Sequence, residues 1–137
     1  LIAYDSRVDS FRKITSLFKH ICASNLTPEG LTFEAIKNEL VAASGDKESY
    51  FINFSDGMPY CEPKGYQYWG ESAIQHTKKQ VDNMRKRGIK VLSYFIGQNT
   101  YGSQGEFVRM YGKSAQAIDV TSLIPLAKTL NKMFLTK

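Results

Sequence analysis

The chain has 137 residues, of which 42% are hydrophobic and 23% are charged, and its formal net charge is +5 at pH 7. This length suits one domain built around a single core. No segment approaches the roughly 18 consecutive apolar residues that a membrane span requires, and the opening LIAYDSRVDS does not have the pattern of a secretory signal peptide. Cys22 and Cys61 do not form a CxxC pair, which favours reduced thiols. We therefore expect a cytoplasmic protein.

The amino-terminal part of the chain is predicted to form two short strands and a helix. The apolar run LIAY, followed by a turn signal, predicts a strand at residues 1–5. Residues 8–14 alternate roughly between apolar and polar, and we expect them to form an antiparallel edge strand. Residues 16–23 carry apolar side chains at helical spacing, so a short helix is expected there.

A longer helix is predicted from Thr27 to about Ala43. Thr27 followed by Pro28 is typical of a helix start, because the hydroxyl accepts unpaired backbone N–H groups and proline has no N–H to leave unpaired. The apolar residues that follow recur at the spacing of one helix face, at Phe33, Ile36 and Leu40.

Three apolar segments later in the chain predict the strands of a parallel sheet. Residues 49–55 and 89–96 are apolar with little alternation, which is typical of strands buried on both faces, and residues 115–120 form a shorter third segment. Strands separated by helices predict an α/β fold with a mostly parallel sheet flanked by helices. The whole chain, residues 1–137, is expected to be a single domain.

The helices between and after these strands are also predicted. The helix at residues 71–87 should bury one face and end at Gly88; its inward residues are expected to be Ala73, Ile74, Thr77, Val81 and Met84. One or two helical turns are expected at residues 105–112, and a last helix should begin at Thr121.

Polar residues follow the predicted strands at their carboxyl ends, where open α/β sheets bind ligands. Asp56 follows the first long strand, Thr27 opens the helix before it, and residues 97–100 follow the next strand. Asp56 and Thr27 offer hard oxygen ligands of the kind that Mg²⁺ or Mn²⁺ prefers. Each also has an ordinary structural interpretation, Asp56 as part of an Asp-Gly turn and Thr27 as a helix cap.

A long loop at residues 55–70 is rich in aromatic residues beside this proposed site. Exposed aromatic side chains are the usual anchors of protein interfaces. We therefore predict a partner-binding surface formed by Tyr60, Tyr66, Tyr68 and Trp69. The alternative is that one or two of these rings pack over the edge of the sheet.

The positive charge is concentrated in HTKKQVDNMRKRGIK, residues 76–90. This pattern is typical of a solvated helix face, and a nucleic-acid-binding patch is the alternative. No RNP, helix-turn-helix or zinc-finger pattern accompanies it. His20 and His76 fall on predicted helices, and we do not expect either to be catalytic.

The order of these motifs resembles a von Willebrand factor A (VWA) domain. The segments NLTPEG, FINFSDG, IKVLSYFIG and AIDVTSLIPLAKTLNKMF follow one another as in that family, and they are most similar to the A domain of the CobT-type cobaltochelatase subunit. The resemblance covers nearly the whole chain. It implies a Rossmann-like sheet and a metal-ion-dependent adhesion site (MIDAS), with Thr27 and Asp56 as ligands of Mg²⁺ or Mn²⁺. It also implies a protein partner, typically an AAA+ ATPase of the MoxR type.

One part of the family pattern is absent. The DxSxS motif that supplies three metal ligands does not occur in this sequence. The resemblance therefore implies that the chain begins at strand two of the family fold, as a fragment without its first strand, and that its metal site is incomplete. Sheet edges left open near residues 1–5 and 50–54 would invite self-association.

These observations favour a metal-assisted protein–protein interaction module, not an enzyme by itself, acting as a non-catalytic subunit of a cobaltochelatase-like or remodelling complex. One alternative is a small Mg²⁺-dependent α/β hydrolase or phosphotransferase that uses Asp56, although the sequence contains no P-loop or GxSxG motif. The other is a basic nucleic-acid-binding domain that uses residues 78–90.

Overall fold

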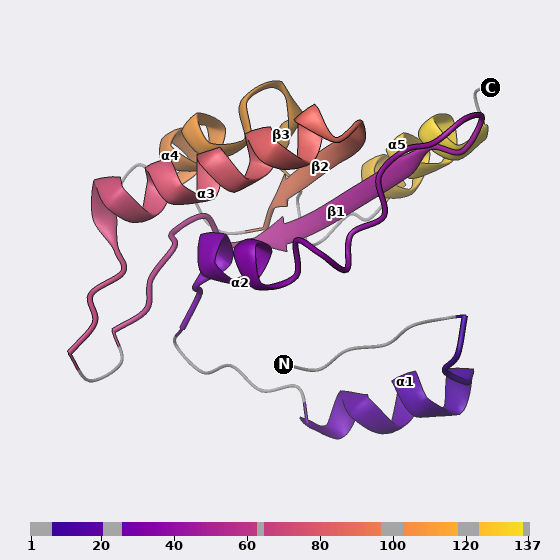
Figure 1. The fold of residues 1–137 in the computed structure, drawn as a ribbon, viewed down its shortest axis with the longest axis horizontal. Helices are drawn as coiled ribbons and strands as arrows, with labels where there is room; N and C mark the ends of the chain where they lie inside the picture. The colour runs from indigo at the N-terminus through magenta and orange to yellow at the C-terminus, as the bar shows by residue number, and fades with distance from the viewer. Residues whose placement is uncertain (1–6, 21–25, 63–64, 97–102, 118–123, 136–137) are drawn as a thin grey trace.

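The computed structural model describes residues 7–20, 26–62, 65–96, 103–117 and 124–135. Figure 1 shows a central sheet with helices packed against it and one short helix set apart. The helices are α1 (Phe11–Leu17), α2 (Glu29–Ala35), α3 (Gly70–Lys86), α4 (Ser103–Tyr111) and α5 (Ile124–Leu135), with 3₁₀ turns η1 (Phe18–His20) and η2 (Gly112–Ser114). The strands are β1 (Ser49–Ser55), β2 (Ile89–Phe95) and β3 (Ala115–Ala117).

The described strands form a parallel sheet in the order β1-β2-β3. Ser49 lies opposite Ile89 at one end of the β1–β2 pair, and Ser55 lies opposite Phe95 at the other. The predicted α/β class and parallel sheet are thus confirmed. The third strand is confirmed at its start, while the strand predicted at residues 1–5 lies outside the described residues. Among the described strands, β1 pairs with β2 alone, so it forms an edge of this sheet.

The main core lies between one face of the sheet and helices α2, α3 and α4. Phe33 of α2 meets Phe51 of β1 edge to face, with ring centroids 5.1 Å apart. The buried members of this cluster are Phe33, Ile74, Val81, Met84, Ile89, Val91, Phe95, Phe107, Met110 and Tyr111. Burying one side chain of this size stabilises the fold by about 1.5–3 kcal/mol, so this cluster supplies most of the driving force for folding.

Helix α3 confirms the predicted inward face, because all five of the predicted residues are buried: Ala73, Ile74, Thr77, Val81 and Met84. Gly88 adopts a positive φ of 77° just after the helix, in the left-handed conformation that glycine favours at a helix end. Within the described ranges, no helix combines the length and the apolar character needed to cross a bilayer.

The predicted edge strand at residues 8–14 is wrong, because residues 11–17 form α1. Val8, Phe11 and Ile14 are spaced three apart, which fits a helix better than the two-residue period of a strand. An ion pair one turn apart, with Lys13 Nζ 2.7 Å from a carboxylate oxygen of Asp9, supports the helix. Figure 1 shows α1 away from the sheet, and the Phe11 side chain is 75% exposed.

Helix α2 is shorter than predicted, since it ends at Ala35 and not near Ala43. The guanidinium of Arg87 donates to the backbone carbonyls of Lys37 and Leu40. A helix continued to Ala43 would have used the Lys37 carbonyl for its own hydrogen bond, with the N–H of Val41. A tertiary contact from the end of α3 therefore replaces the second half of the predicted helix with turns.

Candidate functional site

A pocket of about 370 Å³ lies beyond the carboxyl end of β1, and we call it the carboxyl-edge pocket. Its lining comes from the start of α2, from the last residues of β1 and from the residue after β2: Thr27, Pro28, Glu29, Thr32, Phe33, Asn53, Phe54, Ser55, Asp56 and Ile96. This is the position at which open parallel sheets bind ligands. Thr27 and Asp56 therefore line one pocket, while their role as metal ligands stays a prediction.

Thr27 joins the start of α2 to the loop after β1. Its backbone pairs with Tyr60 in both directions, through N···O distances of 2.7 and 3.0 Å. Its hydroxyl donates to the carbonyl of Met58 at 2.6 Å and accepts the Tyr60 N–H at 3.2 Å. The sequence suggested a helix cap, but the hydroxyl caps this loop instead. Thr27 thus holds the loop against the pocket.

Asp56 lies in a tight turn that presents its carboxylate to solvent. Gly57 takes a φ of +101°, which a side chain would disfavour, and its N–H donates to the hydroxyl of Ser55 at 3.0 Å. The carbonyl of Ser55 accepts the N–H of Ile96 at 2.9 Å, which extends the β1–β2 ladder to the rim. The Ser-Asp-Gly sequence therefore ends the strand and leaves the Asp56 side chain at the mouth of the pocket.

Glu29 is a second carboxylate in the pocket, and sequence reasoning missed it. Only 9% of Glu29 is exposed, and its Oε2 accepts a hydrogen bond from the hydroxyl of Tyr111 at 2.9 Å. Asn53 donates to the same Tyr111 oxygen at 2.9 Å. The sequence does contain a signal for the burial of Glu29. Glu29 lies four residues before Phe33, so the two share a helix face, and Phe33 faces the core.

Burial raises the pKa of the Glu29 carboxyl, and hydrogen bonds from Ser55, Tyr111 and Asn53 oppose that rise. The nearby charge of Asp56 acts in the same direction as burial. The pKa of Tyr111 is also raised, first by burial and then by the charge of Glu29. The pocket therefore contains one buried carboxyl group with a raised pKa and a second carboxyl group open to solvent.

The described residues offer the right chemistry for a hard cation but too few donors. Among them, no group of three or more His, Cys, Asp or Glu side chains is placed to hold a metal ion. The pocket supplies the carboxylates of Glu29 and Asp56 and the hydroxyls of Thr27 and Ser55, all of them oxygen donors. A divalent cation of this kind prefers about six oxygens, so water or another chain would have to complete its shell.

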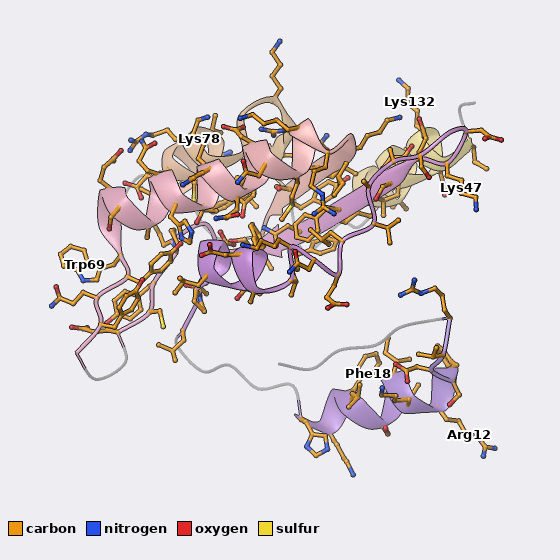
Figure 2. The ribbon with its side chains drawn as sticks, in the orientation of Figure 1. Arg12, Phe18, Lys47, Trp69, Lys78 and Lys132 are labelled. Atoms are coloured by element: carbon orange, nitrogen blue, oxygen red, sulfur yellow. The ribbon has the colours of Figure 1, made fainter. Side chains whose placement is uncertain are left out.

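The aromatic loop divides into exposed rings and one buried ring. The exposed rings are Tyr60, Tyr66 and Trp69, and Figure 2 shows Trp69 projecting from the ribbon. Tyr68 differs from the expected exposed position, since it is 4% exposed and packs with Cys61 and Ala73. The backbone explains this difference, because Cys61 and Tyr68 pair in both directions at 2.8 Å and fold the ring inward.

The basic helix face is partly neutralised by neighbouring groups. Lys78 Nζ lies 2.6 Å from one carboxylate oxygen of Asp82, and Arg85 donates to the other at 3.1 Å. Arg87 is held by backbone carbonyls. Figure 2 shows Lys78 on the outer side of α3. Both interpretations of this face, a solvated helix face and a nucleic-acid-binding patch, stay predictions.

Residues 97–100, which were predicted to contribute to the carboxyl edge of the sheet, lie outside the described residues.

Comparisons with protein families, with curated proteins and with solved structures give no match for this chain.

Proposed function

We propose that this chain is a metal-assisted protein–protein interaction module of the VWA type, in which the carboxyl-edge pocket and the exposed rings of the aromatic loop act as one docking surface. The observation that carries this proposal is the pairing of Thr27 with Tyr60, which joins the pocket to the loop that bears Tyr66 and Trp69. The motif order described above supports the same assignment.

In this proposal, Asp56 supplies the exposed carboxylate for Mg²⁺ or Mn²⁺, and Thr27 positions the adjacent loop. The cation would attract a carboxylate of the partner protein, which supplies an oxygen that this chain does not. The aromatic rings would supply the apolar part of the interface, where large rings contribute most of the binding energy. Metal and partner therefore bind together more strongly than either binds alone.

The partner that the VWA resemblance supports is an AAA+ ATPase of the MoxR type in the cytoplasm. This chain would act as a non-catalytic subunit of a chelatase-like or remodelling complex. The edge of β1 adds a second proposed contact, self-association by strand pairing, because an unpaired strand edge offers backbone donors and acceptors to another chain.

The test is a titration of the chain against a purified MoxR-type ATPase, with Mg²⁺ and then with a chelator in excess. We expect Asp56→Asn to weaken binding in Mg²⁺ and to have no effect once the metal is chelated. Asp46→Asn is the matched control, because Asp46 is an exposed acid in the turn before β1 and does not line the pocket. Binding of equal strength in chelator would contradict the metal-assisted mechanism.

A second candidate, hydrolysis or phosphoryl transfer, is favoured by one observation. Glu29 and Asp56 line the same pocket, one buried and one exposed, and two carboxyls in such different environments can act as acid and base. Turnover of p-nitrophenyl phosphate in Mg²⁺ that is lost in Asp56→Asn would favour this candidate over the interaction module.

A further inference from the structure

A second pocket, of about 260 Å³, lies between α2 and α3, and we call it the α2–α3 pocket. It is lined by Phe33, Lys37, Asn38, Gln80, Asn83, Met84 and Arg87. Phe33 also lines the carboxyl-edge pocket, but the other six residues do not. The proposed function above does not use this second pocket.

The lining of this pocket combines an apolar floor with a polar, positively charged rim. Phe33 and Met84 are buried members of the main core. Gln80 is buried and its side-chain nitrogen lies 3.0 Å from Nε2 of His76, while Asn38 and Asn83 add two more amides. No Asp or Glu belongs to the described lining, whereas Lys37 and Arg87 do. Polar groups placed around an apolar floor can fix the orientation of a bound small molecule.

The two cations play different parts. Each terminal nitrogen of Arg87 donates one hydrogen bond, to the carbonyls of Lys37 and Leu40. These two bonds hold the guanidinium in place, so Arg87 contributes a fixed positive charge to the rim. Lys37 Nζ lies 4.0 Å from a carboxylate oxygen of Glu34, and both side chains are about half exposed. Such surface pairs contribute little, so a ligand can take over this ammonium group.

From these contacts we propose that the α2–α3 pocket binds a small monocarboxylate with an apolar body. The apolar body would lie on Phe33 and Met84, and the carboxylate would meet Lys37 and the amides at the rim. The apolar floor favours a ligand with an apolar body, which inorganic phosphate does not have. The carboxylate can belong to a free acid or to the carboxyl terminus of a peptide that ends in an aromatic residue.

The proposal can be tested by NMR titration of the ¹⁵N-labelled chain with benzoate, with the neutral analogue benzamide and with inorganic phosphate. We expect benzoate to shift the backbone amides of residues 33–38 and 80–87, with an affinity about tenfold higher than that of benzamide. Phosphate should not displace it. Equal affinity for benzoate and benzamide, displacement by phosphate, or no localised shift at tens of millimolar benzoate would overturn the proposal.

Two variants and two peptides complete the design. Lys37→Gln should weaken benzoate binding about fivefold or more, because a hydrogen bond to a charged group is lost. Lys79→Gln is the matched control, since it removes the same charge from an exposed position on α3 outside the lining, and it should leave binding unchanged. An unaffected Lys37→Gln variant would contradict the proposal.

Two peptides distinguish the sources of the carboxylate. If a peptide acid that ends in phenylalanine displaces benzoate but its carboxamide does not, the carboxylate belongs to a chain terminus. Displacement by neither peptide identifies a free acid.

Discussion

The hydroxyl of Tyr111, at the end of α4, donates to the carboxylate of Glu29, at the start of α2, across 2.9 Å. This bond joins a helix that precedes β1 to a helix that follows β2, and it holds Glu29, which lines the carboxyl-edge pocket. Asn53 of β1 completes the chain of hydrogen bonds by donating to the same hydroxyl. Tyr111 therefore links two residues that line the pocket, Glu29 of α2 and Asn53 of β1.

The raised pKa of Glu29 makes the stability of the fold depend on pH. A carboxyl with a raised pKa in the folded state is penalised when ionised, so stability falls as the pH rises from the unfolded value of 4.5 through the folded pKa. Glu29→Gln keeps an acceptor for Tyr111 and removes this penalty. We expect the variant to melt higher than the wild type at pH 7, with the difference shrinking as the pH falls below the unfolded value of 4.5. Melting curves across about pH 3–8 measure the difference, and a constant difference at every pH would contradict the assignment.

Gly30 is predicted to tolerate no side chain. A Cβ at this position would overlap the hydroxyl of Tyr68 and approach the backbone nitrogen of Thr77 to 2.9 Å. Because the backbone of α3 cannot move away cheaply, Gly30→Ala should destabilise the fold by about 1–3 kcal/mol. Gly105→Ala is the matched control, since the added Cβ would meet nothing within 4 Å and alanine favours the helix. Urea denaturation of both variants tests the prediction, and equal midpoints would refute it.

Alanine substitutions at Trp69 and at Tyr68 should have different effects, the first on partner binding and the second on folding stability. Trp69 is 53% exposed, so Trp69→Ala should weaken binding to the ATPase partner by about 2 kcal/mol or more and leave the melting temperature nearly unchanged. Tyr68→Ala, at the adjacent buried ring, should cost about 3–5 kcal/mol of folding stability. Partner titration and thermal melting, run on both variants, give the comparison. A Trp69→Ala variant that melts early and binds normally would assign that ring to the core.

Residues 1–137 alone are expected to bind Mg²⁺ or Mn²⁺ more weakly than micromolar. The pocket offers two carboxylates, and the hydroxyl of Thr27 already donates to Met58. A cation that prefers about six oxygens would keep most of its water shell in such a site. Isothermal titration calorimetry measures the affinity directly. A micromolar dissociation constant would show that further ligands exist and that Thr27 and Asp56 do not describe the site.

Strand pairing at β1 is expected to make the chain self-associate at high concentration. Ile52, in the middle of this edge strand, is partly exposed, and the edge carries no proline. Ile52→Lys should shift the population toward monomer, because edge lysines block strand pairing. Val41→Lys is the control, since Val41 is an exposed apolar residue outside the sheet. Light scattering coupled to size exclusion measures the shift, and a wild-type chain that stays monomeric at every concentration would exclude this mode of association.

The sequence predicts the elements that depend on local pattern. Residues 49–55 and 89–95 are strands because their apolar runs need burial, and α3 follows from the helical spacing of its inward residues. The two main errors have different causes. The pattern at residues 8–14 fits both the strand and the helix period, and the sequence alone does not distinguish them. The shortening of α2 comes from Arg87, a residue about fifty positions away, which no local pattern reveals.

The sequence predicts where the candidate site lies better than it predicts which residues form it. Thr27 and Asp56 both reach the pocket because topology brings helix starts and strand ends to the same edge. Glu29 was missed because an acid in the first turn of a helix is common and needs no special explanation. The burial of Tyr68 was not predictable among neighbouring aromatic residues, because it depends on the pairing with Cys61.

The contact of Arg87 with the carbonyls of Lys37 and Leu40 also sets an order of events during folding. Arg87 lies 50 residues from Lys37 and 47 residues from Leu40 in the sequence. The contact therefore closes a long loop, and it forms slowly compared with the turns of a helix. Before α3 docks, residues 37–43 are free to continue α2, as their apolar spacing favours. The native turns at residues 37–40 therefore depend on the docking of α3, through a contact that the local sequence does not encode.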